Sequence, residues 1–159
     1  GALREKQTDA IWIFYGWGGI SAQQSGLDFD YFYFKDIDPV FDYYTPILIA
    51  NNDFLENRPE VAKAFLSVAA RGYEYAIENP DEAARMLIEG DDTGSLAGSE
   101  EMVKASQAWI TDQYKAEVDR WGYIDPARWN AFYSWLNDNN LVENPIPENT
   151  GFSNDYLPQ

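Results

Sequence analysis

The expected fold follows from one junction, in which Ala10-Ile11-Trp12-Ile13-Phe14-Tyr15 runs directly into Gly16-Trp17-Gly18-Gly19. The first run is β-branched and aromatic on both of its faces, a pattern typical of a buried parallel strand. The glycines then end the strand in a turn, after which residues 20–25 can form a short helix. Ligands of open α/β sheets bind at the carboxyl ends of strands, so this turn is a candidate ligand site.

The rest of the chain adds two predicted strands and then only helices. The strands cover residues 29–34 and 44–50, and Pro46 favours an edge or strand-start position in the second. Apolar spacing and start signals predict helices over about 59–78, 80–90, 99–115 and 126–139, with Asn57, Asn79 and Ser99 capping the first three. Residues 91–98 are expected to be a polar connecting loop. This order indicates an α/β fold with few strands followed by several helices.

The composition excludes several classes of function. Hydrophobic residues make up 45% of the 159 residues and aromatic residues 16%, which favours a folded core over disorder. The formal charge of −16 repels phosphate backbones, so we expect no nucleic-acid partner, and contact with a membrane only through an anchor outside this chain. The chain has no His and no Cys, so we expect no catalytic triad, no metal site and no cofactor.

The turn after the first predicted strand is the best candidate site. Its members are Tyr15, Gly16, Trp17, Gly18 and Gly19. Glycines let the backbone approach a ligand closely, and the flanking aromatic rings offer stacking faces to a flat heterocycle. The alternative is a tight turn whose aromatic side chains only fill the core.

Several segments, in order and spacing, resemble the NMT1/THI5-like (SsuA/THI5-like) family of ABC-transporter substrate-binding proteins. They are Phe14-Tyr15-Gly16-Trp17-Gly18-Gly19-Ile20, Tyr44-Thr45-Pro46-Ile47-Leu48-Ile49-Ala50, Asn57-Arg58-Pro59-Glu60-Val61, residues 72–84, Ile124-Asp125-Pro126-Ala127-Arg128-Trp129 and Phe152-Ser153-Asn154-Asp155-Tyr156-Leu157. The resemblance implies the C-terminal half of a type II periplasmic-binding-protein fold. Residues 1–37 would then end the second lobe as strand-helix-strand, residues 38–42 would be a hinge crossing, and residues 43–159 would complete the first lobe.

The same resemblance implies a function without chemistry. The protein would be the solute-binding component of an ABC importer, bringing a small heterocycle such as a thiamine pyrimidine precursor to the permease. It would lie outside the cytoplasm, in the periplasm or as a cell-surface lipoprotein, with the export signal and part of the ligand contacts upstream of Gly1. Pyrimidine-binding members tend to carry an acidic side chain near the turn, where this sequence has Gly18 and Gly19. The identity of the heterocycle is therefore open.

Asp42 and Tyr43 extend the candidate site, because they fall at the implied hinge. A hinge carboxylate can face the cleft and accept hydrogen bonds from a ligand amine. The alternative for these residues is a solvated acidic linker.

Two other functions compete with solute binding. Thiamine-pyrimidine synthases of the same superfamily are enzymes, but they carry a cysteine cluster where this chain has Phe41-Asp42-Tyr43-Tyr44-Thr45-Pro46. This difference argues against an enzyme. An aromatic-rich carbohydrate-binding protein is favoured only by composition. Because unflanked strands leave sheet edges and apolar surface uncovered, we also expect the chain to self-associate.

Overall fold

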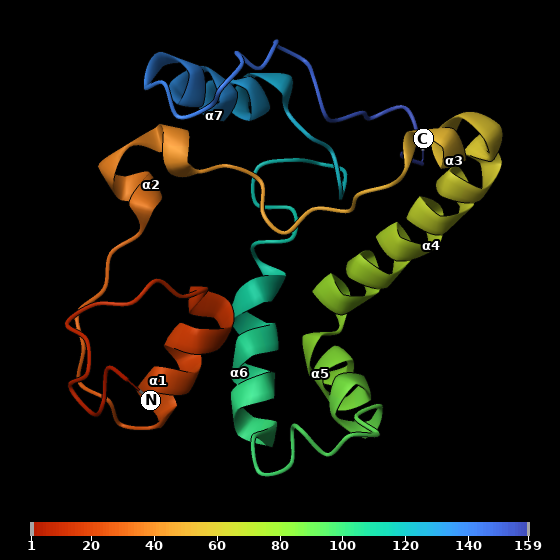
Figure 1. Cartoon of the computed structure of the whole chain (residues 1–159). Coiled ribbons are helices and arrows are strands. Elements are labelled where there is room, and N and C mark those ends of the chain that lie inside the picture. Colours follow the sequence, from red (N-terminus) through yellow and green to blue (C-terminus); the bar gives the residue numbers. More distant parts are fainter. Residues whose placement is uncertain (1, 159) are drawn as a thin grey trace. The chain divides into compact units, whose positions relative to one another are not determined.

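Every regular element that the computed structural model describes, over residues 2–158, is helical (Figure 1). The described α-helices are seven: α1 (Ile20–Gln24), α2 (Phe34–Ile37), α3 (Asn52–Asn57), α4 (Pro59–Glu78), α5 (Pro80–Glu89), α6 (Glu100–Thr111) and α7 (Pro126–Asp138). A π-helical turn, η1 (Tyr15–Gly19), precedes α1, and a 3-10 turn, η2 (Pro39–Phe41), follows α2. The expected α/β class is therefore wrong, and with it the expected sheet of a type II periplasmic-binding-protein fold.

The three predicted strands fail for one physical reason. A strand is stabilised by a neighbouring strand that pairs with its backbone N–H and C=O groups, and the described residues form no such ladder. Residues 10–14, 29–33 and 44–50 instead follow extended or irregular paths. Their apolar side chains remain open to solvent, as Trp12 at 66% exposure and Ile49 at 88% illustrate. The sequence pattern thus identified these segments as apolar, but an apolar pattern does not show whether a neighbouring strand is present to pair with them.

The helix predictions are largely confirmed, although the capping predictions are not. Helix α4 has the predicted bounds, but Asn57 belongs to the end of α3 and Arg58 separates it from α4. Asn79 and Ser99 stand at the N-cap positions of α5 and α6 without a capping side-chain hydrogen bond. Asp125 does cap α7, because its side chain accepts a hydrogen bond of 3.0 Å from the Arg128 backbone N–H.

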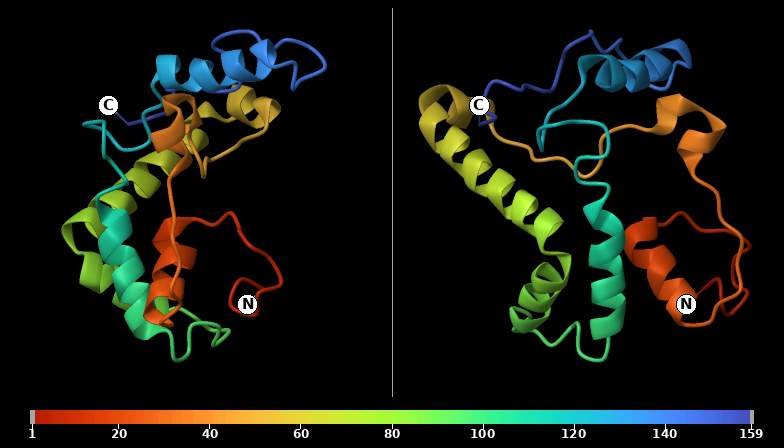
Figure 2. Two further views of the ribbon diagram at one scale, coloured as in Figure 1. Left: turned by 90° about the vertical axis from the view of Figure 1, so that its left-hand side faces the viewer. Right: turned by 180° about the vertical axis from the view of Figure 1, so that it is seen from behind.

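The described residues divide into two compact units, and α4 contributes to both. The first unit joins the residues up to Asp30 with Arg71–Trp121. Within it, α6 packs between α5 on one side and η1 with α1 on the other, as Figures 1 and 2 show. Its most buried side chains are Ile20, Ala84, Val103 and Ser106. The core of this unit is therefore small and lies along α6.

The second unit joins Tyr31–Ala70 with the residues from Gly122 onward. Here α7 packs against η2, and hydrogen bonds join the segment after α7 back to that helix. Three contacts hold this return: Asn137 with Ile146, Asn130 with Asn149, and the Trp129 indole N–H with the Thr150 carbonyl at 2.9 Å. The lobe and hinge boundaries expected at residues 37 and 42 remain predictions.

Candidate functional site

The turn η1 closes on its own backbone. The backbone N–H groups of Trp17 and Gly18 both donate to the Phe14 carbonyl, at 3.2 and 2.9 Å. At the other end, the Ile20 N–H donates to the Tyr15 and Trp17 carbonyls. Single π-helical turns are rare in proteins, but those that occur often lie at functional sites. The sequence placed a glycine-rich turn here correctly, but as the end of a strand rather than the start of a helical segment.

Two of the glycines are required by the protein's own packing. A Cβ atom added at Gly16 would lie 2.8 Å from Cζ3 of Trp109, and one added at Gly19 would lie 2.5 Å from Cδ2 of Tyr15. Both distances are too short for any side chain without rearrangement. Gly16 and Gly19 are accordingly buried. Their small size admits aromatic rings of this chain, which is the packing role that the sequence left open as the alternative to ligand contact.

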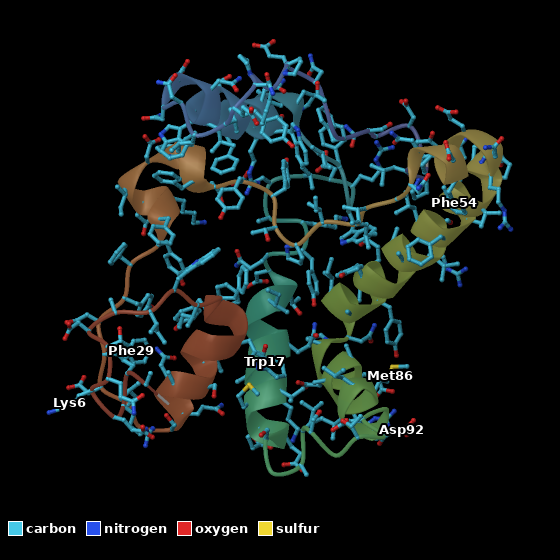
Figure 3. The ribbon with its side chains drawn as sticks, in the orientation of Figure 1. Lys6, Trp17, Phe29, Phe54, Met86 and Asp92 are labelled. Atoms are coloured by element: carbon cyan, nitrogen blue, oxygen red, sulfur yellow. The ribbon has the colours of Figure 1, made fainter. Side chains whose placement is uncertain are left out.

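Helix α6 holds the turn from outside through Ser106 and Trp109. The buried Ser106 hydroxyl donates a hydrogen bond to the Gly16 carbonyl, and the Trp109 ring packs 5.2 Å from the Tyr15 ring. Trp17 lies beside α6 and keeps 45% of its surface exposed (Figure 3). Among the candidate residues of the turn, Trp17 is the side chain that a ligand can reach most directly.

Asp42 and Tyr43 lie in the second unit, where α7 engages both of them. The Asp42 carboxylate forms an ion pair with Arg128, whose Nη2 is 3.0 Å from Oδ1, and the Arg128 Nε–H also donates to the Asp42 carbonyl. The same guanidinium lies over the Tyr44 ring at 4.5 Å. Tyr43 stacks on Phe132 with ring centroids 4.4 Å apart. These residues therefore help attach the segment after η2 to α7.

The structure brings the candidate residues together in two separate groups. Tyr15 to Gly19 form one continuous turn in the first unit, and Asp42 and Tyr43 are neighbours in the second. Sequence reasoning missed four residues that act on them: Ser106, Trp109, Arg128 and Phe132. Apolar spacing did predict the helix that carries Ser106 and Trp109, but no signal in the sequence linked that helix to Gly16.

A hollow of about 270 Å³ lies elsewhere in the first unit, between α1 and the start of α6. It is lined by Ser21, Gln24, Ser25 and residues 98–102, all of them polar or small except Met102. Because this lining contains no aromatic ring and carries Glu100 and Glu101, it offers no stacking surface for a flat heterocycle. We therefore place the candidate site at the turn rather than in the hollow.

The loop after α5 is organised by one carboxylate. Asp91 accepts hydrogen bonds from the Thr93 hydroxyl at 2.5 Å and from the Leu96 backbone N–H at 2.7 Å. These bonds favour the charged form and lower the pKa of the Asp91 carboxyl from its ordinary value. The polar connecting loop expected over residues 91–98 is thus confirmed.

Across residues 2–158, acidic side chains do not gather in threes in a way that could hold a metal ion. Within the same range, we find no helix with the length and apolarity needed to cross a bilayer.

Comparison with known proteins gave one family and one curated relative. The family model described as "NMT1/THI5 like" matches residues 1–83. The formylaminopyrimidine-binding protein of Halalkalibacterium halodurans is 30% identical over 125 residues, which are 78% of this chain and 38% of the relative. The chain thus spans well under half of the length of the curated relative that it matches.

Proposed function

Since this chain belongs to the NMT1/THI5-like family, we propose that it is part of the solute-binding component of an ABC importer. In this proposal it binds a small heterocycle, such as a pyrimidine precursor of thiamine, and delivers it unchanged to the importer's permease on the outer side of the membrane. The support is the similarity to a protein named for binding a formylaminopyrimidine, a flat nitrogen heterocycle. The relative is a binding protein, which favours binding over catalysis.

One observation carries the placement of the ligand at η1. Trp17 keeps 45% of its surface exposed, although Gly16 and Gly19 of the same turn are buried. A partly exposed indole on an anchored turn loses little conformational freedom when a flat ring stacks on it. We propose that Trp17 supplies this stacking face. Tyr15 and the glycines shape the turn, and Gly18 directly follows Trp17 in the chain.

Asp42 and Tyr43, which lie in the second unit, remain in the proposal as a separate candidate contact region. A carboxylate has two oxygens with about four acceptor positions, so its ion pair with Arg128 leaves capacity for a ligand amine. The neighbouring Arg128 also orients this carboxylate through the ion pair. No acidic side chain stands at Gly18 or Gly19, so an amino-substituted ring needs an acceptor from another part of the protein.

Calorimetric titration of the protein tests this function. The probes are a formylaminopyrimidine, riboflavin and pyridoxal phosphate, each added to the wild type, to Trp17→Ala and to Trp12→Ala. Trp12 is the matched control, because it is an exposed tryptophan of the same unit outside the turn. We expect the pyrimidine to bind, Trp17→Ala to weaken it by about ten-fold or more, and Trp12→Ala to change it by less than about two-fold. Failure of all three probes to bind, or equal losses in both variants, would contradict the proposal.

A further inference from the structure

We infer that Ser106 and Trp109 of α6 are positioning residues, which hold the turn η1 in the conformation that presents Trp17. Only the part of the inference that concerns ligand binding to Trp17 rests on the proposed function. The conformation of the turn itself can be measured without a ligand.

The hydrogen bond of Ser106 is the first support. A serine in the interior of a helix commonly bonds to the carbonyl one turn earlier in its own helix, or points to solvent. The Ser106 hydroxyl instead donates to Gly16, 90 residues earlier in the chain, and the serine is only 8% exposed. A buried carbonyl that loses its donor is not compensated by water. Ser106 therefore ties the middle of the turn to α6.

The ring of Trp109 is the second support. It occupies the space that the absent Gly16 side chain leaves, with ring atoms Cζ3 and Cε3 at 2.8 and 2.9 Å from the position a Cβ would take. It also packs against the Tyr15 ring at 5.2 Å. The turn thus meets a hydrogen-bond donor and a flat apolar surface from the same face of one helix.

Together these contacts hold the part of the turn that its own backbone hydrogen bonds do not hold. Its own hydrogen bonds fix its two ends, at the Phe14 carbonyl and at the Ile20 N–H. The contacts from α6 fix Tyr15 and Gly16, the residues directly before Trp17. A change at Ser106 should therefore alter the orientation of the Trp17 indole without touching it.

The test compares three variants of the protein. Ser106→Ala removes the hydroxyl, Ser106→Thr retains one, and Thr111→Val removes a hydroxyl from the same helix. The Thr111 hydroxyl is the matched control, because it donates at 2.8 Å to the Gln107 carbonyl of its own helix. Alanine is the best helix former, so Ser106→Ala is expected to fold. The readouts are the indole N–H resonance of Trp17 without ligand, the melting temperature, and the dissociation constant for the formylaminopyrimidine.

We expect Ser106→Ala to move the Trp17 indole resonance and to weaken pyrimidine binding by about ten-fold. Ser106→Thr should return the Trp17 resonance and the pyrimidine affinity most of the way to their wild-type values. Thr111→Val should leave the resonance and the affinity as in the wild type, even where its melting temperature falls. An unmoved Trp17 resonance in Ser106→Ala, or an equal shift in Thr111→Val, would overturn the inference. If the wild type binds no probe, the proposed function fails, and the ligand-free resonance alone decides the role of Ser106.

Discussion

Arg128 and Asp42 lie 86 residues apart in the chain and are joined twice, through the side chain and through the backbone. The guanidinium Nη2 is 3.0 Å from the carboxylate, and the Nε–H donates to the Asp42 carbonyl. Both side chains are less than a third exposed. This pair therefore connects the segment after η2 to α7 more firmly than an exposed ion pair would.

Replacing Arg128 should destabilise the second unit. We expect Arg128→Met to lower the free energy of unfolding by about 1–3 kcal/mol, because it removes hydrogen bonds to a charged group and to a carbonyl. Arg128→Lys is the control: it retains the charge but cannot reproduce the two-point geometry, so it should lose an intermediate amount. Urea denaturation measures both values. A Met variant as stable as the wild type would show that the pair contributes nothing.

Gly16 should not tolerate a methyl group. We expect Gly16→Ala to cost about 1–3 kcal/mol of unfolding free energy, because the new Cβ would collide with the Trp109 ring. Gly72 in α4 provides the opposite case, because a Cβ there meets nothing within 4 Å. Gly72→Ala should therefore raise stability by about 0.5–1 kcal/mol through helix propensity. Thermal denaturation compares the two, and changes of the same sign would contradict the packing described for the turn.

Protonation of Asp91 should lower the free energy of unfolding in acid. Hydrogen bonds from the Thr93 hydroxyl and the Leu96 N–H lower the pKa of its carboxyl in the folded state. A carboxyl of lowered pKa contributes stability that is complete above about pH 5 and is lost as the pH falls through its folded value. Asp91→Asn cannot titrate, so its stability should vary less with pH below about pH 5 than that of the wild type. Urea denaturation from pH 6 to pH 3 measures the difference, and parallel curves would refute the assignment.

The exposed apolar segments predict self-association. Ile47, Leu48 and Ile49 are 47%, 60% and 88% exposed, in an extended segment without a paired neighbour in the described structure. The net charge of −16 opposes contact between copies, so association should increase with salt as that repulsion is screened. We expect Ile49→Lys to reduce it without loss of stability. Sedimentation at low and high salt is the measurement, and a monomer at every salt concentration would contradict the prediction.

Local signals explain what the sequence could predict. Helix α4 was placed with its correct bounds because Pro59 can begin a helix and Asn79-Pro80 ends it, and both effects act over a few residues. The same holds for α7, whose cap Asp125 lies next to Pro126. The predicted strands were wrong because a strand depends on a distant partner that an apolar pattern does not specify.

In the candidate site too, local features were predicted and contacts between distant residues were not. The turn at Tyr15–Gly19 was found because three of its five residues are glycines. Its anchors were not found, since the contact of Ser106 with Gly16 spans 90 residues and leaves no trace in local spacing. Similarly, Asp42 and Tyr43 were singled out from their place at an implied hinge, whereas Arg128 and Phe132, which hold them, lie on a helix far along the chain.

The most direct test of the central claim follows the indole N–H resonances of the six tryptophans while the protein is titrated with the formylaminopyrimidine. Trp17→Phe assigns the Trp17 resonance by its disappearance. If the ligand stacks on the turn, the Trp17 resonance will move most. The dissociation constant fitted to its shift will equal the one measured by calorimetry. Binding that leaves the Trp17 resonance in place while another indole moves would show that the ligand lies elsewhere.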